Sequence, residues 1–104
     1  LVYSFGSNGD DSFESAVKAR APGCRIFTFD PTLDKKARAH MLSVEYGGVL
    51  KLVEMGLGAR DATVPIYTWN STRNFPVRSL LSHMEKLGHA AKSLSVLKID
   101  VESA

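Results

Sequence analysis

Three groups of residues have side chains or backbone suited to binding a polar ligand. The first is the turn Gly6-Ser7-Asn8-Gly9, which follows a short apolar run and precedes a segment that begins like a helix. The second is Asp30, which ends the apolar run 24–29, and the third is Asp100 with Glu102, near the end of a later run. A strand, a glycine turn and a helix start are typical of a nucleotide-type ligand site, because glycine lets the backbone turn tightly and approach a ligand.

The acidic residues suit different parts of such a ligand. A carboxylate accepts hydrogen bonds from two vicinal hydroxyl groups at once, so Asp30 suits a ribose. The alternative is that Asp30-Pro31 is only a turn that ends a strand. Asp100 and Glu102 are two residues apart on an expected strand and therefore share a face. Asp100 could accept a proton from a nucleophile, but a positioning role is preferred, and a strand-end acid that caps a turn is the structural alternative.

The two acids after the glycine turn argue against a phosphate ligand. The dinucleotide fingerprint G-x-G-x-x-G is not matched, because Asn8 and Asp11 stand where its second and third glycines would be. Asp10 and Asp11 suit the positive end of a helix dipole, but they would repel a phosphate bound there. They would not repel a ligand that carries a sulfonium and an ammonium group. This charge argument favours S-adenosylmethionine over NAD.

The order of apolar runs and helical patterns predicts an α/β fold with a Rossmann-like, doubly wound and mostly parallel sheet. Strands are expected over residues 1–5, 24–29, 49–55 and 94–101, and helices over residues 12–21, 33–46 and 79–87. Asp11 and Glu14 have the spacing of a capping box at the first of these helices. Because the carboxyl ends of parallel strands meet at one edge of a sheet, the three groups of candidate residues are expected to converge there.

The segment between the third strand and the last helix gives weaker signals. Two short β segments are expected around 66–69 and 75–78, and Pro76 predicts that the second is an edge strand or a loop. Asn70-Ser71-Thr72 has the form of a glycosylation acceptor, a triplet that recurs by chance. The histidines His40, His83 and His89 lack metal-ligand spacing, so no metal site is expected, and these side chains are expected to lie at the surface or to be partly packed.

Size and composition exclude several classes of protein. The chain has 104 residues, of which 44% are hydrophobic and 23% charged, as in an ordinary globular domain. A net charge of +2 with scattered basic residues does not indicate nucleic-acid binding, and no apolar run is long enough to span a membrane. Because both ends fall at expected strands, residues 1–104 are expected to be one partial domain, the cofactor-binding half of a larger one.

Four stretches in this order resemble successive motifs of class I S-adenosylmethionine-dependent methyltransferases. They are VYSFGSNGDDSFE, FTFDPT, GLG and VLKIDVESA, and they cover essentially the whole chain. The closest likeness is to the FkbM-related and methyltransferase-like 24-type groups, although Ser103 replaces the glycine that usually follows the strand-four acids. The resemblance implies a truncated class I methyltransferase fold, S-adenosyl-L-methionine as cofactor, and methyl transfer to an oxygen or nitrogen acceptor.

The resemblance also implies roles for particular positions. The glycine turn would line the methionine part of the cofactor, Asp30 would hold the ribose, and Asp100 with Glu102 would face the methyl-transfer site. The adenine would lie near the GLG stretch. The residues expected to bind the cofactor are thus Gly6, Ser7, Asn8, Gly9, Asp30, Pro31, Leu57, Gly58 and Asp61. Two alternatives share this fold logic and stay open: a nicotinamide-dependent oxidoreductase, and a degenerate domain that binds only a nucleoside or a protein partner.

Overall fold

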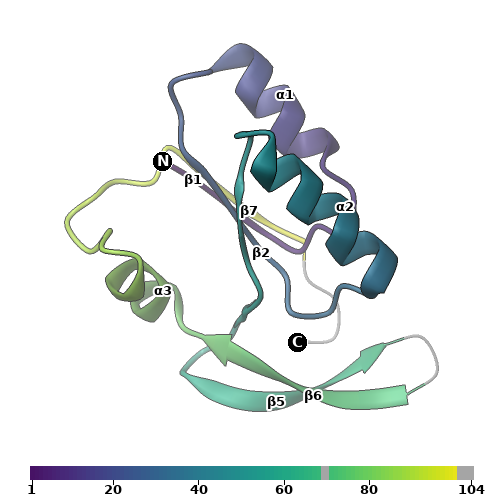
Figure 1. Ribbon diagram of the computed structural model, residues 1–104. Helices are drawn as coiled ribbons and strands as arrows, with labels where there is room; N and C mark the ends of the chain where they lie inside the picture. Colours follow the sequence, from purple (N-terminus) through teal and green to yellow (C-terminus); the bar gives the residue numbers. More distant parts are fainter. Residues whose placement is uncertain (69–70, 101–104) are drawn as a thin grey trace.

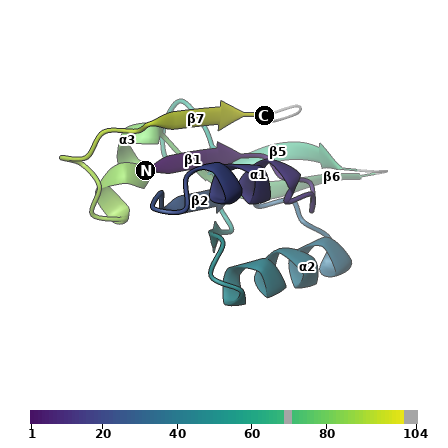
Figure 2. The ribbon, with the colours of Figure 1, turned by 90° about the horizontal axis from the view of Figure 1, so that it is seen from above.

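The computed structural model describes residues 1–68 and 71–100, and it shows an α/β fold. Within these residues the main sheet has four parallel strands, β1 (Val2–Phe5), β2 (Ile26–Phe29), β3 (Lys51–Val53) and β7 (Val96–Ile99). Their order is β3-β2-β1-β7, and Figure 2 shows β7, β1 and β2 in succession across the sheet. The predicted α/β class and mostly parallel, Rossmann-like sheet are confirmed.

The strand order contains a reversal between β1 and β7. The chain first adds β2 and β3 on one side of β1, and it later places β7 on the other side. In open parallel sheets such a reversal separates the loops that leave the two neighbouring strands, so that a crevice opens at their carboxyl ends. The fold therefore places the ends of β1 and β7, Gly6 and Asp100, at the position where such sheets bind ligands.

Helices cover both faces of the main sheet. They are α1 (Ser12–Arg20), α2 (Lys35–Tyr46) and α3 (Leu80–Lys86), with α1 and α2 together on one side and α3 on the other (Figure 1). Alternation of side chains along β1 explains this arrangement: Val2 faces α1 and α2, whereas Tyr3 and Phe5 face α3. Among the described residues, no helix is both long and apolar enough to cross a bilayer.

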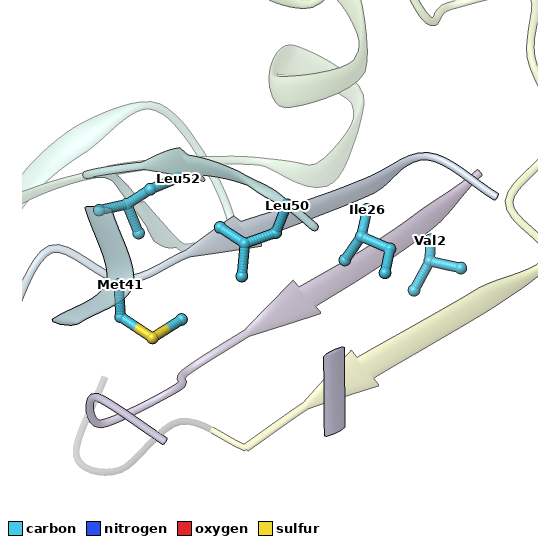
Figure 3. Packing of buried hydrophobic residues seen from close by; sticks show 5 residues of the cluster. All are labelled: Val2, Ile26, Met41, Leu50 and Leu52. Carbon is cyan, nitrogen blue, oxygen red and sulfur yellow. The ribbon is translucent and has the colours of Figure 1, made fainter. Parts of the chain in front are cut away.

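The α1–α2 face is held by a buried aliphatic cluster. Figure 3 shows Met41 reaching from α2 toward the sheet side chains of this cluster, which consists of Val2, Ile26, Met41, Leu50 and Leu52. The opposite face buries the aromatic residues Tyr3, Phe5, Phe27 and Phe29, against which Leu80 and Met84 of α3 pack. Burial of each such side chain stabilises the fold by roughly 1.5–3 kcal/mol, so both clusters fix the sheet that carries the candidate site.

A second sheet departs from the sequence prediction. Within the described residues it has three strands, β4 (Gly56–Leu57), β5 (Ala62–Thr68) and β6 (Ser71–Arg78), in the order β4-β6-β5. The β5–β6 hairpin runs along the bottom of Figure 1. The prediction that Pro76 lies on an edge strand or in a loop is wrong, because β6 is the middle strand. Pro76 is tolerated since β4 pairs with β6 only at Val77 and Arg78.

The predicted capping box is also wrong. Asp11 is the N-cap residue of α1, but its side chain bonds the Ser15 hydroxyl and His40 instead of the helix backbone. Glu14 is fully buried and accepts a hydrogen bond from the Thr28 hydroxyl at 2.6 Å. The first turn of α1 is thereby attached to the middle of β2.

Two of the three histidines contradict the expectation that they lie at the surface or are only partly packed. His83 and His89 are buried, because α3 and the segment after it pack against the aromatic face of the sheet. His89 Nδ1 lies 2.6 Å from the Tyr3 hydroxyl. Burial raises the pKa of Tyr3 and lowers the pKa of His89, so the tyrosine donates this hydrogen bond to a neutral imidazole.

Candidate functional site

The Asp30 carboxylate holds the glycine turn at the carboxyl end of β2. Its Oδ2 accepts hydrogen bonds from the backbone N–H groups of Ser7 and Asn8, both at 3.0 Å. Its Oδ1 accepts from the Thr32 backbone N–H at 2.9 Å and from the Thr32 hydroxyl at 2.7 Å. Asp30 is only 4% exposed. The Ser7 hydroxyl also donates to Oδ2, at 3.5 Å. A ligand hydroxyl at this carboxylate would replace one of these donors, and the Thr32 hydroxyl is one that can rotate away.

The turn itself adopts the left-handed conformation that its sequence permits. The φ angles are 87° at Gly6, 52° at Asn8 and 79° at Gly9. Glycine and asparagine are the residues that adopt such angles at least cost. A Cβ at Gly9 would lie 2.6 Å from the Cβ of Ala37, so this glycine also lets the turn approach α2. Gly9 therefore has a packing role within the chain, and its expected role in approaching a ligand stays a prediction.

The end of β7 meets the end of β1 beside this turn. The backbone N–H of Asp100 donates to the Phe5 carbonyl at 2.9 Å, which places the exposed Asp100 next to Gly6. The Lys98 ammonium donates to the Gly6 carbonyl at 3.0 Å. The sequence reasoning gave Lys98 no role, although its spacing of two residues from Asp100 puts the two on one face. Glu102 lies outside the described residues.

The remaining predicted residues fall into two places. Pro31 lies against Gly56, since a Cβ at Gly56 would be 3.3 Å from Pro31 Cγ, and this contact brings Leu57 and Gly58 toward the end of β2. Asp61 instead stands at the start of α3, where its carboxylate accepts from the Ser79 backbone N–H at 3.2 Å and the Ser82 hydroxyl at 2.6 Å. The structure thus joins the turn, Asp30 and Asp100 directly, and Leu57 and Gly58 through Pro31.

A buried histidine on α3 is hydrogen-bonded to the backbone of β4 at Gly56. The Nε2–H of His83 donates to the Gly56 carbonyl at 2.7 Å, and its ring packs against Phe5 and Phe29. Burial lowers the pKa of His83, which keeps the imidazole neutral, and the carbonyl partner requires its single proton to be on Nε2. Sequence reasoning missed this residue, because a histidine beside Met84 on an amphipathic helix gives no signal of a backbone partner on another segment.

Negative charge dominates the loop that follows the turn. A backbone hydrogen bond from Ser12 lowers the pKa of Asp10, and the hydrogen bond from His40, followed by that from Ser15, lowers the pKa of Asp11. Both carboxylates are therefore ionised at neutral pH. With Asp30 and Asp100 at the adjoining strand ends, this edge suits a ligand with positive charge and hydroxyl donors, and it disfavours a pyrophosphate.

The opposite edge of the sheet carries a different feature. A cavity of about 480 Å³ lies where β2 and β3 begin, and its lining includes Lys18, Arg25, Lys51, Ile26 and Leu50. Because these residues lie at the amino ends of the strands, the cavity is separate from the candidate site. In the described part of the chain no group of three or more histidine, cysteine or acidic side chains is placed to hold a metal ion.

Comparison with known proteins agrees with this geometry. Searches of the curated proteins and of the solved structures gave no match to the chain. A family model described as a methyltransferase domain matches residues 1–104. The match includes the glycine turn, Asp30, Lys98 and Asp100, the residues that meet at the reversal of strand order. The chain therefore belongs to a family of methyltransferase domains.

Proposed function

We propose that residues 1–104 are the cofactor-binding half of a class I methyltransferase that uses S-adenosyl-L-methionine, similar to the FkbM-related and methyltransferase-like 24-type groups. The observation that supports this most is the meeting of the glycine turn, Asp30 and Asp100 at the reversal of strand order between β1 and β7. Ligands of open parallel sheets bind at this position. The family membership gives the methyl-transfer chemistry, and the charge of the site favours this cofactor.

Each strand end has a role in the proposal. Asp30 accepts the ribose hydroxyls in exchange for the hydroxyl of Thr32. The Gly6–Gly9 turn lines the methionine part of the cofactor, and Leu57 with Gly58 lies near the adenine. The resemblance also places Asp61 near the adenine, although both oxygens of its carboxylate are bonded at the start of α3. Asp100, together with Glu102, faces the site of methyl transfer.

When bound, the cofactor supplies a methyl group on a sulfonium, and the reaction is an in-line displacement by an oxygen or nitrogen nucleophile. The protein contributes mainly by alignment, which can supply a large part of the rate enhancement without acid–base chemistry. Asp100 is exposed at the end of β7, so it can orient the acceptor or the cofactor's ammonium group. It is also able to accept the proton that an acceptor hydroxyl or amine releases.

Two rival readings make different predictions. A nicotinamide-dependent oxidoreductase would place a pyrophosphate beside the turn, where the ionised Asp10 and Asp11 would repel it. A degenerate domain would bind a nucleoside or a protein partner without catalysis, and the fold permits this because fold does not imply function.

Calorimetric titration of the full chain that carries residues 1–104 separates these readings. We expect saturable binding of S-adenosyl-L-methionine and S-adenosyl-L-homocysteine and none of NAD. Binding of NAD without either adenosyl ligand would refute the proposal. Cofactor binding without methyl transfer to any acceptor, followed as release of S-adenosyl-L-homocysteine across a broad acceptor panel, would favour the non-catalytic domain.

A further inference from the structure

Lys98 places a positive charge within the acidic edge of the sheet. Its Nζ donates a hydrogen bond to the Gly6 carbonyl at 3.0 Å and lies 5.4 Å from the centre of the Phe13 ring. The side chain is half-buried. Among residues 1–68 and 71–100, no carboxylate forms an ion pair with this ammonium. An ammonium has three N–H donors, so two remain for a ligand.

The register of β1 and β7 explains why the charge reaches the site. Lys98 is paired with Ser4, two residues before Gly6, so its side chain extends along β1 toward the carboxyl edge of the sheet. Asp100 follows two residues later on the same face of β7. The end of β7 therefore carries an ammonium and a carboxylate on the same face, and the ammonium is bonded to the first carbonyl of the turn, that of Gly6.

This pair has the charges needed to recognise an α-amino acid group. On the basis of the function proposed above, we propose that Lys98 binds the carboxylate of the cofactor's amino-acid end while Asp100 binds its ammonium. The surrounding charges make such a cation necessary. Asp10, Asp30 and Asp100 would repel a ligand carboxylate, and the nearby His40 is already hydrogen-bonded to Asp11. The Lys98 ammonium offsets this repulsion at the glycine turn.

Two other roles for Lys98 are distinguishable from this one. In the first, Lys98 has only a structural role, which is to hold the turn in place through its hydrogen bond to the Gly6 carbonyl. In the second, the Gly6 carbonyl is the acceptor for the ligand's own ammonium, so the Lys98 ammonium competes with the ligand for it. The first role affects every adenosyl ligand equally, and the second makes removal of the lysine favourable for ligands that carry an ammonium.

The test compares two ligands that differ only in the relevant group. S-adenosyl-L-homocysteine carries the amino-acid end, and 5′-methylthioadenosine has the same adenosine and thioether without it. Calorimetric dissociation constants are measured for the wild type, Lys98→Met, Lys98→Arg and Lys92→Met, the last being a control at an exposed lysine. Lys98→Met is expected to weaken the binding of S-adenosyl-L-homocysteine roughly 10- to 100-fold and the binding of 5′-methylthioadenosine less than about twofold. Lys98→Arg should restore most of the loss, and Lys92→Met should change neither.

The other outcomes contradict the proposal in separate ways. An equal loss for both ligands would mean that Lys98 only shapes the turn, and tighter binding of S-adenosyl-L-homocysteine by Lys98→Met would mean that it competes. If the wild type bound both ligands equally well, the proposed cofactor site would stand, but the proposed recognition of the amino-acid end would be refuted. A wild type that binds neither would remove the proposed function together with this inference. Thermal unfolding of each variant verifies that it is folded.

Discussion

Replacement of Asp30 tests whether one carboxylate holds the glycine turn. The side chain is 4% exposed and accepts four hydrogen bonds of 2.7–3.0 Å from Ser7, Asn8 and Thr32. Asp30→Ala removes these four contacts and a longer one from the Ser7 hydroxyl at 3.5 Å. Asp30→Asn keeps the volume but turns an NH₂ group toward one set of donors, so it should retain about half of the contacts.

The magnitude follows from the exposure of the donors. A hydrogen bond to a charged group contributes roughly 1.5–3 kcal/mol, but a donor that water can reach recovers most of this when its partner is lost. Asn8 is exposed and Thr32 half-buried, whereas Ser7 is buried. The unsatisfied Ser7 N–H therefore accounts for most of the loss. Asp30→Ala is expected to lower the free energy of unfolding by about 2–4 kcal/mol, and Asp30→Asn by about 1–2 kcal/mol.

Urea unfolding followed by circular dichroism measures both variants against Asp34→Ala. Asp34 is a matched control, because its exposed carboxylate caps α2 through one hydrogen bond to the Ala37 N–H at 2.7 Å. Its loss should cost about 1 kcal/mol. The reasoning is refuted if Asp30→Ala costs no more than Asp34→Ala. If Asp30 also holds a ribose, Asp30→Ala should weaken the binding free energy of S-adenosyl-L-homocysteine by roughly 1–3 kcal/mol, an effect that Asp34→Ala should not share.

Two further predictions concern pH and the glycine turn. Burial lowers the pKa of His83 and of His89 below the ordinary value of 6.5, so the unfolded chain takes up protons first as the pH falls. Their contribution to the free energy of unfolding should be fully present above about pH 6.5 and should be lost as the pH falls from there toward the folded pKa values. Urea unfolding at several pH values measures this loss. If the pH dependence in His89→Gln were the same as in the wild type, His89 would not contribute to it. Gly9→Ala should destabilise the protein by at least about 1–2 kcal/mol, because φ is 79° and the new Cβ would lie 2.6 Å from that of Ala37. Gly23→Ala, with open space around it, should unfold at nearly the wild-type urea concentration, and equal effects of the two changes would refute the packing argument.

The main sheet was predictable from sequence because its strands are short apolar runs separated by clear helical patterns. The α3 helix illustrates the strength of local signals: Ser79, where the helix was expected to begin, caps it by accepting from the Ser82 N–H at 3.1 Å, and Gly88 follows it with a φ of 77°. Leu80 and Met84 of this helix pack against the aromatic face of the sheet, whereas Leu81 is 61% exposed.

The parts that sequence reasoning missed depend on partners far away in the chain. Glu14 matches a local capping pattern, but the Thr28 hydroxyl on β2 provides its partner. Two β segments were expected where β5 and β6 lie, but their pairing into a second sheet was not, because β propensity reflects pairing and packing and the proline at position 76 argued against a central strand. Within the candidate site, the turn and Asp30 could be placed from order alone. The Lys98 contact could not, since it joins residues 92 positions apart.

That separation has a consequence for folding. The contacts of Asp30 with the turn span at most 23 residues, whereas those of Lys98 with Gly6 and of Asp100 with Phe5 span more than 90. Contacts of high sequence separation form late, because the entropy of closing a long loop opposes them. The Asp30 side of the site is therefore expected to assemble early, and the side formed by Lys98 and Asp100 only when β7 docks. A ligand that contacts both sides would bind only the docked state and would shift the docking equilibrium toward it, so that docking of β7 and the affinity for such a ligand would be thermodynamically linked.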